Sequence, residues 1–365
     1  MEFPNIYKGN YRLLAIAPVI LILVSLYYIP QLQLGVEFTG GTLLSFRVPE
    51  EVSAEEFSEI LIAQGLDGDV KVFPTARGYQ VEILLPSDPQ FARAEELKEK
   101  FFNRIDDVER LAFLAAEDPS QQNAYNIQRA ELDGITDEMF TLAQHPAQAG
   151  SMDNFRELRS EFLNSYTLVY DNYQRAVTTP FASRYEVSSM ALETVSPTLS
   201  VHFLATATQI VIISAILSIL LVFLFFRTFV PSLAIIIGAF SDIVIALGAM
   251  GFFGIPLTFP SFAALLMLVG YSLDTDILLT MRMLRQEGTP RDNAYAAMKT
   301  GTTMTLTGLI AFGVLFLLSL FTHIPTYFEI SSVALVGLIG DLFATWGINA
   351  LLMLWHVERS SHASA

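Results

Sequence analysis

The sequence predicts a polytopic α-helical membrane protein with six transmembrane helices and one α+β domain outside the membrane. Three observations predict this fold class: a high apolar content, six long apolar segments, and an acidic stretch between the first two of them. Of the 365 residues, 52% are hydrophobic and 16% are charged, and the mean hydropathy is +0.46, above that of a typical soluble domain. There is no cysteine, which excludes disulfides and thiolate metal sites.

The six apolar segments are long enough to cross about 30 Å of hydrocarbon, which takes roughly 20 helical residues. They cover residues 13–29, 203–226, 229–253, 259–281, 303–321 and 328–355. Lys8 and Arg12 precede the first segment, and no small-residue cleavage site follows it. We therefore expect an uncleaved membrane anchor rather than a signal peptide.

The distribution of basic residues predicts the orientation. Lys and Arg lie before the first segment, after the last, and in the connections after the second and fourth, at positions 8, 12, 227, 282, 285, 291, 299 and 359. The loops at 254–258 and 322–327 have none. The positive-inside rule then places both termini in the cytoplasm. The expected parts are a cytoplasmic N-terminus with the first helix (1–30), an extracytoplasmic domain (31–202), five helices (203–355) and a cytoplasmic tail (356–365).

The extracytoplasmic domain carries nearly all of the net charge. Residues 31–204 contain 28 Asp or Glu and 13 Lys or Arg, whereas the whole chain has a formal net charge of −16. Such a domain will not attract nucleic acid or anionic lipid by charge. We expect no nucleic-acid partner. The lipid bilayer is expected to contact the six helices.

The domain reads as the strand and helix order βαββαβ. Strands are expected near 34–48, 70–74, 79–85 and 185–194, and helices after the Ser53–Glu56 capping pair and at 91–104. This order suggests a ferredoxin-like sandwich. A helical insertion is expected at about 105–182, with one apolar face formed by Phe155, Leu158, Phe162, Tyr166 and Val169. That face packs within the insertion or binds a partner, and internal packing is the preferred interpretation.

Four aspartates fall inside the expected spans: Asp242, Asp274, Asp276 and Asp341. Ionisable groups in a membrane are costly and are functional candidates. The alternative is that each is neutral, hydrogen-bonded and structural. Asp274 and Asp276 lie about 200° apart around a helix, so both cannot face one pocket of an undistorted helix. Lys299 is the cation that could neutralise one of them, or it is a free interfacial anchor.

Several motifs resemble one known family. Residues 35–42 read GVEFTGGT and residues 270–273 read GYSL, while Asp242 lies in a Ser-Asp-Ile sequence. The residues that carry the first two motifs are Gly35, Phe38, Thr39, Gly40, Gly41, Thr42, Gly270, Tyr271 and Ser272. Together they resemble the SecF family of protein-export membrane proteins, most closely an archaeal branch. A VSPT segment at 195–198 is similar to the family's V-G-P-x.

The resemblance implies an accessory subunit of the Sec translocon that acts with SecD and a SecY-type channel on unfolded preproteins. It also implies a proton drive, with Asp274 as the proton-linked residue and Asp242 supporting it. Asp276 is expected to matter less, and Asp341 and Lys299 complete the relay candidates. The chain departs from the bacterial pattern by placing Asp274 and Asp276 on either side of Thr275. Lys299 stands where that pattern has arginine.

Two other functions remain open from the sequence. The family resembles half of a resistance-nodulation-division transporter, so a proton-coupled exporter of small molecules or lipids is the alternative. An aspartyl intramembrane protease would use G-x-G-D, but residues 338–341 read LIGD. No nucleotide-binding, zinc-protease or serine-hydrolase motif is present, so we expect no enzymatic activity, cofactor or metal site.

Overall fold

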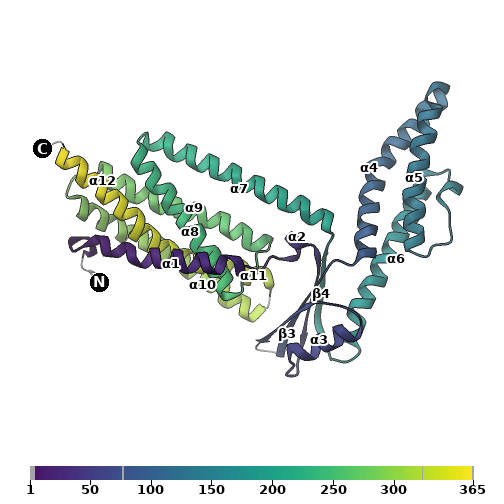
Figure 1. Cartoon of the computed structure of the whole chain (residues 1–365), viewed down its shortest axis with the longest axis horizontal. Coiled ribbons are helices and arrows are strands. Elements are labelled where there is room, and N and C mark those ends of the chain that lie inside the picture. The colour runs from purple at the N-terminus through teal and green to yellow at the C-terminus, as the bar shows by residue number, and fades with distance from the viewer. Residues whose placement is uncertain (1–4, 76–77, 323, 364–365) are drawn as a thin grey trace. The chain divides into compact units, whose positions relative to one another are not determined.

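The computed structural model describes residues 5–75, 78–322 and 324–363 (Figure 1). The chain forms two compact units. One consists of Met1–Phe38 and Phe203–Ala365, and the other is Thr39–His202. We refer to them as the helical unit and the sheet unit.

The helical unit contains six helices that are long and apolar enough to cross a membrane, as expected within the described residues. The spans are Tyr11–Gln31, Leu199–Phe226, Phe229–Phe253, Phe259–Arg285, Pro290–Thr322 and Pro325–Arg359. They correspond to α1 (Ile16–Tyr28) with flanking 3-10 turns, α7 (Pro197–Phe226), α8 (Phe229–Phe253), α9 (Phe259–Arg285), α10 (Pro290–Thr322), and α11 (Pro325–Ala344) with α12 (Ala350–Ala363). The fifth helix begins earlier than expected because residues 290–302 continue it without a break.

The last span is not one uniform helix. A π-helix at Thr345–Asn349 joins α11 to α12. In this segment the Ala350 N–H donates to the Thr345 carbonyl, five residues back, instead of four. Single π-turns of this kind are frequent at functional sites.

The interior of the helical unit is formed by α8 and the last span. In each of these, 56% of the apolar window is buried, against 6% for α7 and 11% for the first span. Glycines allow the close approach: a Cβ on Gly337 would meet the Leu268 side chain, and one on Gly340 would meet Ile245. Polar residues on the inner faces of α8 and α11 are therefore enclosed by protein.

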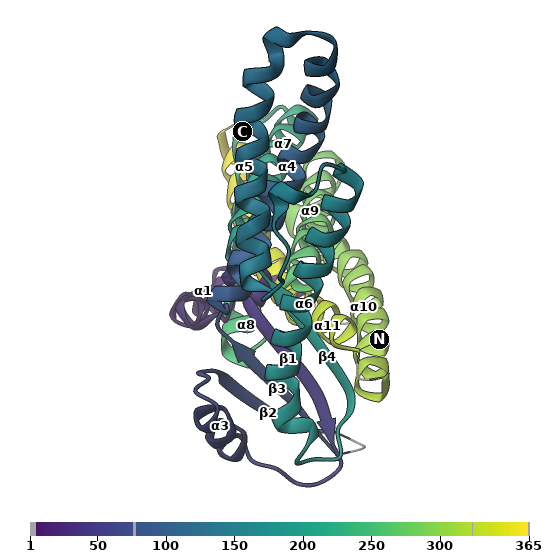
Figure 2. The same cartoon turned by 90° about the vertical axis from the view of Figure 1, so that its right-hand side faces the viewer.

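The sheet unit contains four antiparallel strands in the order β2-β3-β1-β4 (Figure 2). The strands are β1 (Gly41–Val48), β2 (Asp69–Thr75), β3 (Gly78–Leu85) and β4 (Ser188–Val195), and α3 (Ala54–Ala63) follows β1. Ser53 caps α3 by accepting the Glu56 N–H at 3.2 Å. In the register Leu44 pairs with Ile83 on one side and Leu192 on the other. These residues share one apolar face of the sheet.

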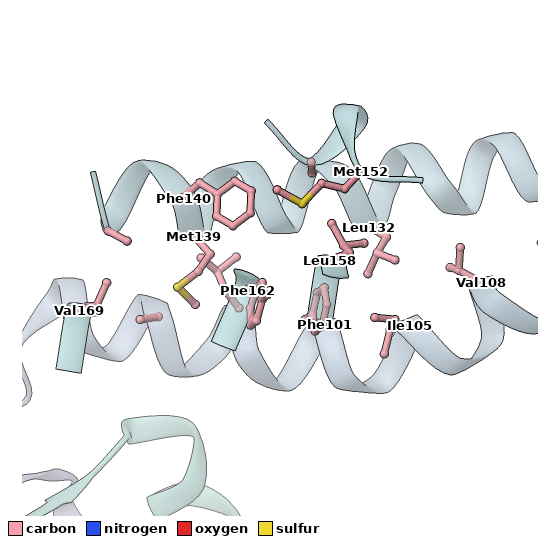
Figure 3. Packing of buried hydrophobic residues seen from close by; sticks show 14 residues of the cluster. Phe101, Ile105, Val108, Leu132, Met139, Phe140, Met152, Leu158, Phe162 and Val169 are labelled. Carbon is pink, nitrogen blue, oxygen red and sulfur yellow. The ribbon is translucent and has the colours of Figure 1, made fainter. Parts of the chain in front are cut away.

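Three long helices follow β3: α4 (Pro89–Glu117), α5 (Gln122–Leu142) and α6 (Phe155–Ala182). Their contact is a separate apolar core (Figure 3). The Phe101 and Phe162 rings stack at its centre, 3.9 Å between centroids and 6° between planes. Leu158, Phe162 and Val169 are all buried here. The apolar face predicted on this segment therefore packs internally, as preferred from the sequence.

The structure has no element boundary at residue 105, and α6, which ends at Ala182, is shared between the helical core and the sheet. The helix expected to end at 104 continues without interruption to Glu117. At the other side, the C-terminal part of α6 packs on the sheet, where Val177 and Phe181 join the core formed by Phe46 and Phe57. The physical reason is that the apolar spacing of α6 continues past the helical core and on to the sheet. Helix α6 thus contributes side chains to both the helical core and the core of the sheet.

Candidate functional site

Three aspartates from three different spans meet in the interior of the helical unit. Asp242 comes from α8, Asp276 from α9 and Asp341 from α11, and none is more than 1% exposed. The distance between α8 and α9 is short here, because a Cβ on Gly238 would overlap the Asp276 carboxylate. We call these three residues the acid cluster.

Hydroxyl and amide groups surround the acid cluster. The Ser272 hydroxyl donates to Asp242 Oδ2. The Asn349 side-chain amide donates to Asp276 Oδ1 at 2.6 Å, and Thr345 Oγ1 lies 2.9 Å from the same oxygen. Both of these residues belong to the π-helix, so its geometry determines how Asp276 is held.

Two hydroxyl groups of the site each lie near more acceptors than they have hydrogens to donate. Thr345 Oγ1 is 2.9 Å from Asp276 Oδ1 and 3.0 Å from Asp341 Oδ1, but it carries only one hydrogen. Thr275 Oγ1 is likewise 2.9 Å from the Ser272 carbonyl oxygen and 3.2 Å from Asp341 Oδ1. Each hydroxyl can donate to one neighbour only. The other contact becomes a hydrogen bond when the carboxyl itself carries the hydrogen.

In the part of the chain that the structure describes, no basic side chain balances the charge of the acid cluster. Among residues 5–75, 78–322 and 324–363, none of the three aspartates is in an ion pair, and no group of acids or histidines is arranged to hold a metal. One oxygen of each carboxyl has no hydrogen-bond partner in the described part of the chain. Three adjacent negative charges in such a place would be strongly unfavourable, and protonation relieves this.

Asp274 and Lys299 are not part of the cluster. Asp274 is exposed on the outer face of α9 and makes no hydrogen bond or ion pair with a described residue. Lys299 is exposed on α10, with its ammonium 4.6 Å from the centre of the Tyr295 ring. It lines a shallow surface pocket with Thr300 and Thr303. The sequence predicted that Asp242 supports Asp274. The structure instead places Asp242 beside Asp276 and Asp341.

Comparison with known proteins gives the family. The sequence model of the family described as "Protein export membrane protein SecD/SecF, C-terminal" matches residues 176–359, half of the chain. The chain belongs to this family. The family is one of protein-export membrane proteins and not of enzymes, which speaks against the protease alternative.

Individual SecF proteins are similar to the chain. That of Methanothermobacter thermautotrophicus is 46% identical over 143 residues, covering 38% of this chain and 50% of the relative. That of Thermococcus gammatolerans is 41% identical over 175 residues, covering 48% and 55%. The chain therefore spans about half the length of the curated relatives that it matches. The resemblance to the SecF family is confirmed.

A solved structure shares the fold. The crystal structure of SecDF, a translocon-associated membrane protein from Thermus thermophilus, has a TM-score of 0.62 to this chain. It is 16% identical, and the match covers 98% of this chain and 40% of that one. At this identity the likeness concerns the fold alone.

The first SecF motif has a structural place in both units. In the helical unit, Gly35 donates its N–H to the Leu257 carbonyl at 2.7 Å, and a Cβ there would meet Thr258. Phe38 packs on Phe259, with ring centroids 5.6 Å apart. The residues between the first span and the sheet are thus fixed to the loop before α9.

The second half of that motif begins the sheet. Thr39 ends a short helix, α2 (Val36–Thr39), and Gly40 and Gly41 follow with positive φ of 71° and 122°. A Cβ on Gly41 would overlap the Leu85 carbonyl oxygen. Thr42 Oγ1 accepts a hydrogen bond from the Tyr173 hydroxyl at 2.6 Å. This bond ties α6 to the sheet.

Some residues of the GYSL motif lie on the surface of α9 and others lie in the interior of the helical unit. Gly270 is exposed with nothing near its Cβ position, and the exposed Tyr271 ring contacts Phe312. Only Ser272 reaches the acid cluster.

Three residues of the site were missed from the sequence: Thr275, Thr345 and Asn349. A signal was present, because Asp341, Thr345 and Asn349 are polar residues at four-residue spacing in an apolar span. This spacing predicts one polar helix face, which the structure places against Asp276.

Proposed function

We propose that this chain is an accessory subunit of the Sec translocon that acts with SecD to promote export of unfolded preproteins across the cytoplasmic membrane. The family and the SecF relatives support this proposal. A structure of SecDF that shares the fold and is much longer than this chain is consistent with a partner such as SecD. A SecY-type channel would be the third component.

We further propose that proton binding at the acid cluster drives the sheet unit through a cycle of movements. The observation that carries this proposal is the pair of hydroxyls, Thr345 and Thr275, each within hydrogen-bond distance of more acceptors than it has hydrogens. Loss of a proton there adds a negative charge between α9 and α11. Such a charge favours a different packing of the two helices.

The proton-linked residue in this proposal is Asp276, supported by Asp341 and Asp242. Asp274 was favoured from its position in the sequence, but its exposed carboxyl lacks the enclosed neighbours that a relay needs. Lys299 is proposed as an interfacial anchor, since its exposed side chain is compatible with that role.

Two structural proposals accompany the function. The sheet unit is taken to be a ferredoxin-like domain, supported by the strand order β2-β3-β1-β4 with α3 after β1. Both termini and the α9–α10 connection are proposed to be cytoplasmic, supported by the basic residues there. The sheet unit is then extracytoplasmic.

Partner and orientation can be tested together with single cysteines, because the chain has none of its own. Ser120→Cys lies between α4 and α5, and Glu287→Cys lies between α9 and α10. In sealed cells an impermeant thiol reagent should label only the first, and crosslinking from it before purification of the tagged protein should recover SecD. Labelling of Glu287→Cys alone would show that the protein has the opposite orientation in the membrane. Recovery of neither SecD nor SecY would overturn the proposed partnership.

A further inference from the structure

The π-helix at Thr345–Asn349 leaves one backbone group without its usual partner. In an α-helix the Ala350 N–H would donate to the Trp346 carbonyl, but here it donates to the Thr345 carbonyl. The Tyr7 hydroxyl donates to the Trp346 carbonyl oxygen instead, at 3.0 Å in a buried position. A side chain from the start of the chain thus satisfies the acceptor that the π-turn exposes.

Tyr7 is suited to be a permanent donor. It lies in a 3-10 turn, Ile6–Lys8, before the first span, and its side chain is 1% exposed. Burial raises the pKa of the Tyr7 hydroxyl above its ordinary value, so the hydrogen remains on the oxygen at any physiological pH. The ring packs in the same apolar core as Trp346.

The segment that carries Tyr7 is fixed on both sides. Asn5 donates its side-chain amide to Asp292 at 3.0 Å, at the start of α10. Further along, the π-helix is close to the first span, because a Cβ on Gly347 would meet Pro18 and the Leu14 carbonyl. The position of the Tyr7 hydroxyl is therefore determined by contacts outside the π-helix that it holds.

The π-helix also supplies Thr345 and Asn349, the two side chains that hydrogen-bond to Asp276 Oδ1. We infer that Tyr7 is a positioning residue for the acid cluster: its hydroxyl stabilises the π-turn, and the π-turn directs Thr345 and Asn349 at Asp276. This inference deepens the proposed function and rests on it for its biological meaning. The link itself is structural and is measurable without export.

Tyr7→Phe is the variant that tests the link. It keeps the ring in the core and removes only the donor. The matched control is Tyr11→Phe, the same change in the same segment, where the hydroxyl donates to Glu358 Oε2 at 2.9 Å. Glu358 keeps its bond from Arg291 Nε at 2.8 Å in that control.

The measurement is the rate at which a lipophilic carbodiimide modifies Asp276 in the purified, bilayer-reconstituted full-length protein, read by mass spectrometry at constant pH. Tyr7→Phe should raise this rate roughly five- to tenfold, comparable to one lost buried hydrogen bond, because the hydrogen bonds from Thr345 and Asn349 to the carboxyl are weakened. Tyr11→Phe should leave it at the wild-type value. In an Asn349→Ala, Thr345→Val background the Tyr7→Phe effect should disappear.

Unchanged labelling of Asp276 in correctly folded Tyr7→Phe protein would overturn the inference, and so would an equal rise in the Tyr11→Phe protein. A rise that persists without Thr345 and Asn349 would show general loosening, and would also overturn it. Hydrogen exchange of residues 345–351 in the Tyr7→Phe and Tyr11→Phe proteins is a second readout that needs little material, with faster exchange expected in Tyr7→Phe alone and unchanged exchange contradicting the link. Failure of the proposed export function would be seen separately, as export that does not depend on Asp276.

Discussion

Asp276→Asn is expected to reduce export of a secreted reporter to the rate seen in cells that lack the protein. Asparagine has the size of aspartate and keeps the hydrogen bond from Asn349 or Thr345, but it cannot bind and release a proton. The stability cost of this change should stay within about 1–3 kcal/mol, so the protein should still accumulate in membranes. The measurement is the export rate at matched membrane abundance.

The control is Asp274→Asn, the same change two residues away on the exposed face of α9. It should leave export close to the wild-type rate. If Asp274→Asn abolishes export and Asp276→Asn does not, the relay passes through the outer face of α9, and the acid cluster does not drive export.

Deleting residues 106–179 is expected to unfold the sheet unit. The deletion removes Tyr173 and Val177 from the core of the sheet, and with Tyr173 the hydroxyl that donates to Thr42. Each large apolar side chain lost from such a core costs about 2–5 kcal/mol, and a domain is stable by only about 5–15 kcal/mol. Protease digestion of membranes should therefore degrade the remaining sheet.

A shorter deletion is the matched control. Replacing residues 110–124 by a short glycine-serine linker removes only the end of the α4–α5 hairpin. It keeps Phe101, Leu132 and Phe162 in the helical core. Loop closure is inexpensive when the ends lie close, so this variant should remain protease-resistant. Equal resistance of both deletions would show that α6 is dispensable for the sheet.

The membrane architecture was predictable because its signal is simple. Apolar length alone identifies the six spans, and helix 229–253 was predicted with the bounds that the structure has. The succession of strands and helices along the sheet unit was predicted from turn residues and alternating apolar positions, but the first strand begins at Gly41 and not at 34, because Val36–Thr39 form a short helix. What failed was the insertion boundary, since the apolar spacing of α6 is the same where Phe162 faces helices and where Val177 faces the sheet. The periodicity of apolar residues shows that a helix face is buried, but it does not show which element that face packs against.

The site was predictable only in part, for a related reason. A sequence shows that Asp274 and Asp276 point to opposite sides of a helix, but it does not show which side is the interior. That depends on the packing of α8 and α11 against α9. The π-helix was not predictable, because Thr345–Asn349 contains no residue that distinguishes a π-turn from ordinary helix.

The claim that the acid cluster holds a proton can be measured directly by infrared spectroscopy of the reconstituted protein at neutral pH. The wild-type minus Asp276→Asn difference spectrum should contain the carbonyl absorption of a protonated carboxylic acid, and that band should shift when the sample is moved to heavy water. The wild-type minus Asp274→Asn spectrum should contain no such band. If the Asp276 difference shows only ionised carboxylate, no proton is held between Asp276 and Asp341, and the proposed drive is contradicted.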